Sequence, residues 1–207
     1  YGDMARLLPR HGVAAFMPTV YTCRFQRMCE KLRAIAAVMR GHRPGSARVL
    51  GAHLEGPFLS PERKGSHPPE EVMAPNVDRA RELWDASEGT IRIMTFAPEV
   101  EGADRLLAFC RRHGIVAAIG HTDANFGTIR EAAAKGMHYA THLFNAMSPF
   151  TSRAPGATGA VLMTGEIMAE IIADGVHVAP EAINLALRLK GAENMILVSD
   201  GISASRD

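Results

Sequence analysis

The sequence is poor in cysteine and in aromatic residues, and it lacks both a long apolar run and a basic cluster. Among 207 residues there are three cysteines, and aromatic residues make up 6%. Cys23, Cys29 and Cys110 are odd in number and lack metal-binding spacing, which predicts free thiols in a reducing cytoplasm. A formal net charge of +1 without an arginine-rich stretch argues against nucleic acid or an anionic membrane as a partner. No run of about eighteen apolar residues is present, so we expect no transmembrane helix.

Two further absences narrow the class of protein. No G-x-G-x-x-G follows an apolar run, which weakens the prediction of a nucleotide-binding sheet. The opening YGDMARLLPRHG has no initiating methionine and no apolar signal core, so we expect it to begin inside a helix of a longer protein. With 47% apolar and 22% charged residues, the composition is that of a globular protein. We therefore expect residues 1–207 to form one domain, a fragment of a longer chain.

Short apolar runs alternate with amphipathic segments along the chain. The runs predict seven strands, at residues 13–20, 48–55, 91–97, 115–121, 137–142, 168–174 and 195–200. Between them, apolar residues at helical spacing predict helices at residues 25–40, 76–87, 102–113, 126–135 and 180–190. This alternation indicates an α/β fold with a parallel sheet covered by helices.

Five polar residues stand at the carboxyl ends of predicted strands: Glu55, His121, His142, Asp174 and Asp200. In a barrel these strand ends form one ring, where active sites are built, whereas in an open sheet they are spread along an edge. The five residues therefore favour a TIM-type (β/α)8 barrel that is incomplete here, with about seven β/α units.

Glu55, His121 and His142 make a ligand set for one divalent metal and leave a coordination position open. Water in an open position can be acidified and become a nucleophile. Asp200 would then accept the proton of that water and later donate it to the leaving group. Zinc suits a mixed nitrogen and oxygen set, and iron, manganese or cobalt would also fit.

Each of these residues also has an interpretation without a function. Glu55 could pair with Arg63 or Lys64. His121 could lie beside a helix cap, and His142 could belong to the core. Their shared position at strand ends favours the metal site over these separate explanations. His53, which alternates with Leu54, is expected to serve packing or to support the site.

Several motifs together carry a resemblance to a known family. They are HLEGPF at 53–58, KGSH at 64–67, GHTDA at 120–124, THLFNAMSPF at 141–150, RAPG at 153–156, ADGVH at 173–177 and LVSDG at 197–201. The chain resembles the N-acetylglucosamine-6-phosphate deacetylases, of the amidohydrolase superfamily, over nearly its whole length. The resemblance implies a metal-dependent hydrolase barrel domain that removes the N-acetyl group of N-acetylglucosamine 6-phosphate, giving glucosamine 6-phosphate and acetate. It also implies amino-sugar metabolism in the cytoplasm.

The resemblance implies metal-binding roles for three positions and catalytic roles for two. Glu55, His121 and His142 match the metal ligands of the family. Asp200 matches the general base and acid, and His67 matches a histidine that helps to polarise the acetyl carbonyl.

The same resemblance implies a set of substrate contacts. His177 matches a contact to a sugar hydroxyl, and Asn145 and Ala146 match the residues that receive the phosphate. Arg153 matches an arginine that crosses the interface of a homodimer to reach the phosphate in the neighbouring site. Ala154 departs from the family pattern, which often has an acidic residue there.

Two alternatives to this function remain open. One is another amidohydrolase, such as a D-aminoacylase or a cyclic amidase, and the other is a non-catalytic fragment that binds a sugar phosphate. From the resemblance we expect the first barrel strand and the small terminal β domain of the family to lie outside these residues, so the resemblance leaves the number of metals open. Residues 143–167 form a long Pro- and Gly-bearing connection with weak helical periodicity, which is typical of a functional segment.

Overall fold

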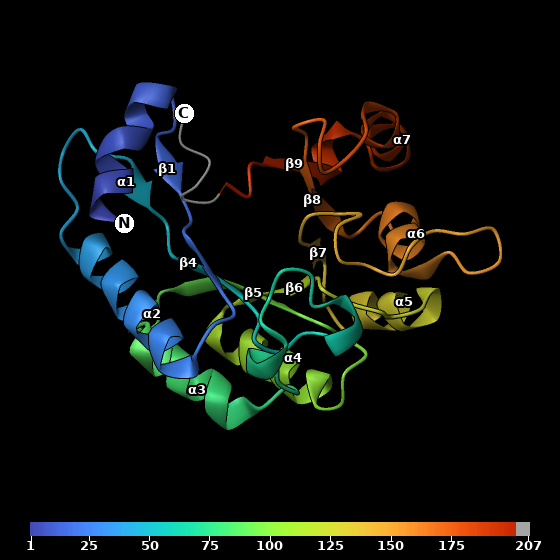
Figure 1. Cartoon of the computed structure of the whole chain (residues 1–207), viewed down its shortest axis with the longest axis horizontal. Helices are drawn as coiled ribbons and strands as arrows, with labels where there is room; N and C mark the ends of the chain where they lie inside the picture. The colour runs from blue at the N-terminus through green and yellow to red at the C-terminus, as the bar shows by residue number, and fades with distance from the viewer. Residues whose placement is uncertain (202–207) are drawn as a thin grey trace.

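A parallel sheet of seven strands forms the centre of the molecule (Figure 1). The computed structural model describes residues 1–201. The spatial order of the strands is β2 (Thr19–Tyr21), β4 (Ala52–Glu55), β5 (Ile91–Phe96), β6 (Val116–Ile119), β7 (Tyr139–Ala140), β8 (Met168–Ile172) and β9 (Met195–Val198). All neighbours pair in parallel, and their order in space is their order in the chain.

The sheet curls, and the main helices lie on its outer side (Figure 1). Its two edges are β2 and β9, which do not pair with each other within the described residues. A separate two-stranded sheet joins β1 (Ala15–Phe16) to β3 (Arg48–Val49). The architecture is an incomplete α/β barrel, which confirms the predicted fold class.

Two of the predicted strands are each divided in the structure. Residues 13–20 form β1 and β2, which are separated at Pro18, a residue that cannot donate a backbone hydrogen bond. Residues 48–55 form β3 and β4 on either side of Gly51. A Cβ at Gly51 would lie 2.3 Å from Cγ of Arg92, so only glycine lets the neighbouring strand approach this closely.

Five helices match the predictions closely: α2 (Phe25–Arg40), α3 (Val77–Ala86), α4 (Ala103–His113), α5 (Phe126–Ala134) and α7 (Pro180–Lys190). The side chains of Asn76 and Asn125 cap α3 and α5, each accepting a backbone N–H at 3.0 Å. The predictions lack α6 (Gly156–Met163), because its first seven residues are all buried and a helix without a polar face has no amphipathic period.

The remaining helical segments are short. They are α1 (Gly2–Leu7) and the 3-10 helices Leu8–His11, Pro61–Arg63, Pro69–Glu71 and Ala192–Asn194. Within residues 1–201, no helix is long and apolar enough to cross a membrane.

The central strands are buried on both faces. Every residue of β4 is buried, and Leu54, Met94, Phe96 and Ile119 are inaccessible to solvent. A polar side chain at such a strand end is therefore removed from most water and needs partners within the protein. The curl of the sheet supplies those partners from neighbouring strand ends.

Gly120 allows three strand ends to come together. An added Cβ at Gly120 would lie 2.6 Å from Cγ2 of Thr95 and 3.3 Å from Cβ of Thr141. We predict that Gly120→Ala lowers the free energy of unfolding by about 1–3 kcal/mol, because the strand ends must separate to admit the methyl group. The control is Gly165→Ala, where no atom lies within 4 Å of the new Cβ. Urea denaturation of the intact protein measures both variants, and equal stability would contradict this account.

Candidate metal-binding and active site

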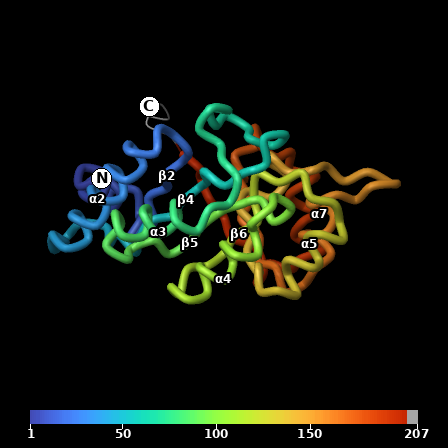
Figure 2. The backbone as a smooth tube through the Cα atoms, turned by 90° about the horizontal axis from the view of Figure 1, so that it is seen from below, coloured from blue at the N-terminus to red at the C-terminus, as the bar shows by residue number. Residues whose placement is uncertain are grey.

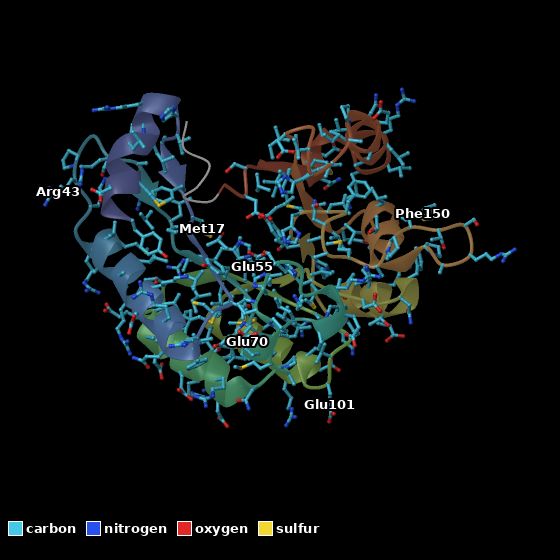
Figure 3. All side chains as sticks on the ribbon, viewed as in Figure 1. Met17, Arg43, Glu55, Glu70, Glu101 and Phe150 are labelled. Carbon is cyan, nitrogen blue, oxygen red and sulfur yellow. The ribbon has the colours of Figure 1, made fainter. Side chains whose placement is uncertain are left out.

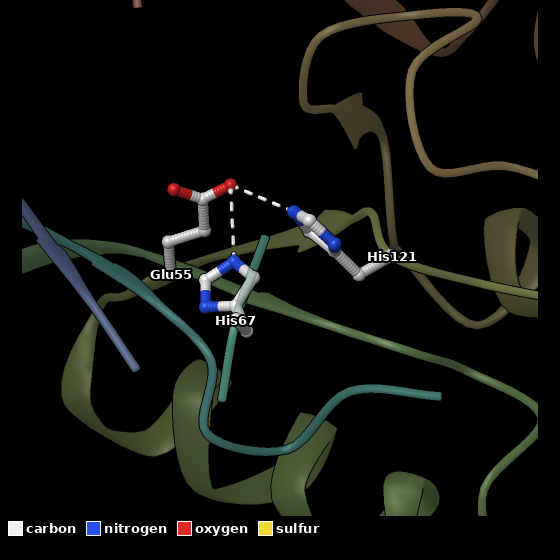
Figure 4. A group of neighbouring side chains, drawn as sticks. All are labelled: Glu55, His67 and His121. Carbon is white, nitrogen blue, oxygen red and sulfur yellow. Dashed lines mark hydrogen bonds and ion pairs between the residues drawn. The ribbon is translucent and has the colours of Figure 1, made fainter. Parts of the chain in front are cut away.

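The carboxylate of Glu55 lies at the centre of a cluster of histidines in the concave middle of the sheet (Figures 3 and 4). Glu55 ends β4 and is only 6% exposed. Its Oε1 lies 2.9 Å from Nε2 of His121, which follows β6, and 2.9 Å from Nε2 of His142, which follows β7. These two nitrogens are 3.2 Å apart, so the three strand ends converge on one point.

His67 joins the cluster from the loop after β4. Its Nε2 lies 3.9 Å from Oε1 of Glu55, and its ring meets the ring of His121 edge to face at 4.5 Å. Glu55, His67 and His121 offer three potential ligand atoms within 4.8 Å of one another. The structure therefore contains a candidate metal-binding group, with His142 equally close to Glu55 and His121.

The tautomer of His121 shows why a cation fits this cluster. Nδ1 of His121 donates a hydrogen bond to the carbonyl oxygen of Arg63 at 3.0 Å. Burial lowers the pKa of His121, which favours the neutral ring. In that neutral form Nε2 carries a lone pair, so two acceptors, Nε2 and the Glu55 oxygen, face each other at 2.9 Å. Ligand atoms around a tetrahedral zinc ion are about 3.3 Å apart, so a cation between these acceptors would relieve their repulsion.

Glu55 is held in its charged form. Burial alone would raise its pKa, but the neighbouring imidazoles of His121, His142 and His67 outweigh burial and keep the pKa well below its usual range. For His142, burial lowers the pKa, while the hydrogen bond to Glu55 and the charges of Glu55 and Asp200 raise it and prevail. An ionised carboxylate beside imidazole nitrogens is a suitable donor set for a divalent metal.

His67 differs from the other two histidines in its hydrogen bonding. The backbone N–H of Thr22 donates to Nδ1 of His67 at 3.2 Å, which leaves the proton of the neutral ring on Nε2. Nε2 of His67 is therefore a hydrogen-bond donor that faces the cluster. Sequence reasoning missed Thr22, because its contact with His67 spans 45 residues and no local motif marks it.

The simple ion pairs considered for Glu55 are not formed. Arg63 binds Asp123 instead, with Nε 2.7 Å from Oδ1, and Lys64 donates to the carbonyl oxygens of Gly65 and His67 at 3.3 Å. The interpretation of Glu55 as a partner of Arg63 or Lys64 is therefore wrong. Both side chains instead shape the loop that carries His67.

Several residues at the strand ends adopt left-handed backbone conformations. The φ angles are 47° at His121, 35° at His142 and 44° at Asp200. Residues other than glycine enter this region at a cost, and such positions gather at functional sites. Asp200 itself follows β9 and is exposed, which leaves its carboxylate open to solvent.

Asp174, the remaining member of the predicted ring, has a different set of contacts. Its carboxylate accepts hydrogen bonds from the backbone N–H groups of Val176 and His177 at 2.9 Å and lies 2.7 Å from Nδ1 of His177. These hydrogen bonds, with the backbone of His177 first, lower the pKa of Asp174 to about 2. Asp174 is thus a poor proton acceptor near neutral pH, and it orients the exposed His177.

The residues expected at the phosphate lie in the segment between β7 and α6. Asn145 donates from Nδ2 to the carbonyl oxygens of His142 and Leu143 at 3.4 Å, and Ala146 has a φ of 51°. Arg153 is exposed in a turn that projects from the body of the molecule, as the orange segment of Figure 2 shows. Phe150, at 57% exposed, lies on the same projection (Figure 3). The structure thus places Asn145 beside the histidine cluster and Arg153 away from it.

His53 lies in a buried hydrogen-bonded row of side chains next to the cluster. It is 7% exposed, and its Nε2 lies 2.7 Å from Oγ1 of Thr95, which lies 2.7 Å from Oγ1 of Thr141. Burial lowers the pKa of His53 and so favours its neutral form. These buried hydrogen bonds link β4, β5 and the residue before His142, in keeping with the supporting role expected for His53.

Known proteins resemble this chain in sequence and in structure. No protein-family model matches the chain. The N-acetylglucosamine-6-phosphate deacetylase of Bacillus subtilis (strain 168) is 37% identical over 204 residues, which are 97% of this chain and 51% of that protein. The chain therefore spans about half the length of the curated relatives it matches.

Solved structures of the same kind share the fold. A crystal structure of N-acetyl-D-glucosamine-6-phosphate deacetylase from Mycobacterium smegmatis superimposes with a TM-score of 0.89 at 34% identity, over 98% of this chain and 53% of that one. A mutant of that enzyme in complex with N-acetyl-D-glucosamine-6-phosphate gives a TM-score of 0.87 at 34% identity, over 94% of this chain and 50% of that one.

Removing the charge of Glu55 tests the candidate metal site. We predict that the intact protein binds zinc and that Glu55→Gln, which keeps the size of the side chain, weakens zinc binding by at least about tenfold. His42→Ala is the control, because His42 is an exposed histidine outside the cluster. Equilibrium dialysis followed by elemental analysis gives both affinities. Equal zinc content in the Gln variant and the parent would rule out Glu55 as a ligand.

Proposed function

We propose that this chain belongs to the family of N-acetylglucosamine-6-phosphate deacetylases over the part that it spans, and that the whole protein has the function of that family. It hydrolyses the N-acetyl group of N-acetylglucosamine 6-phosphate, giving glucosamine 6-phosphate and acetate. The observation that carries this proposal is the convergence of Glu55, His121 and His142 from three strand ends within 3.2 Å of one another.

We propose that Glu55, His121 and His142 hold one divalent metal. Zinc suits this mixed donor set, and iron, manganese or cobalt fits it as well. The chemistry that a bound cation supplies here is a more acidic water and a polarised amide carbonyl. His67 is excluded from the ligand set in this proposal, because the Thr22 amide occupies its Nδ1 and its Nε2 carries a proton.

Asp200 carries out the proton transfers, and His67 stabilises the developing negative charge. The carboxylate of Asp200 takes a proton from the attacking water and then gives it to the amine as the C–N bond breaks. His67 donates a hydrogen bond from Nε2 to the acetyl oxygen, where negative charge develops as the carbonyl is attacked. The hydrogen bond from Thr22 keeps His67 in the tautomer that this step needs.

Substrate binding draws on the loops around the cluster. Asn145 and the backbone N–H of Ala146 would receive the phosphate, and His177, oriented by Asp174, would contact a sugar hydroxyl. Arg153 projects away from its own cluster, which suits a homodimer in which it reaches the phosphate in the partner's site. The cysteines Cys23, Cys29 and Cys110 are unpaired in the structure, which suits the cytoplasm.

Replacing Asp200 tests the proposed proton transfer. We predict that Asp200→Asn keeps the fold, the zinc affinity and the KM, and loses at least about a hundredfold in kcat, because an amide cannot exchange the proton. Asp78→Asn, at an exposed aspartate in the first turn of α3, is the control. Acetate release from N-acetylglucosamine 6-phosphate measures both variants. If Asp200→Asn turns over within a few-fold of the parent, another group is the base.

Mixing two inactive variants tests the proposed dimer. We predict that Arg153→Ala and Asp200→Asn subunits, allowed to exchange in equal amounts, recover about a quarter of the parent activity. Half of the dimers are then mixed, and each mixed dimer has one site with an intact Asp200 and an intact Arg153 from the partner chain. Exchange is followed by fluorescence transfer between labelled subunits. Complete exchange without recovered activity would show that Arg153 does not act across an interface.

A further inference from the structure

Both carboxylate oxygens of Glu99 accept hydrogen bonds from the two residues that follow His121. It lies after β5, and Thr122 donates from its hydroxyl to Oε2 of Glu99 at 2.5 Å. The backbone N–H of Asp123 donates to Oε1 of Glu99 at 2.6 Å. No cation pairs with Glu99 among residues 1–201, so both of its oxygens serve this one loop.

Thr122 connects the loop that Glu99 binds to the loop that follows β7. It is inaccessible to solvent, and its backbone N–H donates to the carbonyl oxygen of Ala146 at 3.0 Å. Its own carbonyl oxygen accepts the backbone N–H of Ser148 at 3.0 Å. Thr122 thus joins the loop after His121 to the loop after His142, and Glu99 fixes the side chain of this bridge.

Asp123 extends the same support to the ring of His121. Its carboxylate binds Nε of Arg63 at 2.7 Å, and the carbonyl oxygen of Arg63 accepts the hydrogen bond from Nδ1 of His121 at 3.0 Å. The path from Glu99 through Asp123 and Arg63 therefore ends on the nitrogen that sets the tautomer of His121. His121 itself has a left-handed φ of 47°, which needs support from its surroundings.

From these contacts we infer that Glu99 is a positioning residue that holds His121 in the conformation and tautomer in which Nε2 faces Glu55. Among the described residues it forms no hydrogen bond or ion pair with Glu55 or the histidines, and it acts through Thr122, Asp123 and Arg63. This inference rests on the proposed function, because it gives His121 the role of a metal ligand. Residues that orient a metal ligand commonly change metal affinity by about ten- to a hundredfold when they are removed.

Two substitutions of Glu99 separate a hydrogen-bonding role from a charge effect. Glu99→Ala removes both acceptors, so we expect zinc affinity of the intact protein to fall by about ten- to a hundredfold. Glu99→Gln can still accept from the Asp123 amide, and its NH₂ group can donate to the Thr122 hydroxyl, which then reverses its role. We therefore expect Glu99→Gln to keep nearly the parent affinity. Glu101→Ala, at an exposed glutamate in the same loop, is the control.

A second measurement follows the loop without metal or substrate. In the metal-free protein, hydrogen exchange of the amides at residues 121–124 is expected to quicken in Glu99→Ala and to stay at the parent rate in Glu99→Gln and Glu101→Ala. A role in stability alone would lower the urea midpoint of Glu99→Ala while leaving its zinc affinity at the parent value. That result would overturn the inference, as would equal losses of affinity in the Ala and Gln variants.

The outcomes also separate this inference from the proposed function. If Glu55→Gln loses zinc while Glu99→Ala binds zinc like the parent, the metal site stands and the inference fails. If the parent binds zinc with the expected dependence on Glu99 but releases no acetate from N-acetylglucosamine 6-phosphate, the proposed function fails and the inference stands. If the parent binds no zinc and exchange at residues 121–124 is unchanged in Glu99→Ala, both fail.

Discussion

A buried negative charge governs the arrangement of the strand ends. Glu55 is 6% exposed, and an ionised carboxylate in such a place is tolerated only where hydrogen bonds and opposite charge surround it. Imidazole nitrogens from two other strand ends and from one loop turn toward it. The hydrogen bonds from Thr22 to His67 and from His121 to Arg63 then give neighbouring rings opposite tautomers. One histidine thus offers a lone pair and another a proton to the same small space.

The sequence predicted those site residues that stand at the ends of the apolar runs that form strands. Parallel strands place their carboxyl ends at one rim, so apolar runs that end in Glu55, His121 and His142 predict that these three side chains lie close together. Residues 25–40 were predicted with the same bounds as α2, since one face of this helix is apolar and the other is polar. In contrast, the first seven residues of α6 are all buried, so its sequence has no amphipathic period.

Other parts of the site depend on contacts between distant segments and could not be predicted from the sequence. The bond between Glu99 and Thr122 joins residues 23 apart in the chain, and neither residue belongs to a pattern that names the other. The left-handed φ of His142 also has no local signal, because histidine is allowed there without being required. Asp174 shared the strand-end position of the metal ligands, yet the turn at 174–177 closes on its carboxylate and commits it to His177.

The order of the strands has a consequence for how the chain can fold as it is synthesised. Within the main sheet, neighbours in space are also neighbours in sequence order, and the edge strands β2 and β9 pair with one neighbour each in the described residues. Among residues 1–201, the main sheet can therefore grow in the order of synthesis, and a chain emerging from the ribosome can add each new strand to an edge already formed. Until the next strand arrives, that edge exposes unpaired N–H and C=O groups, which attract other chains. The pace of translation therefore sets how long each new edge stays open to aggregation.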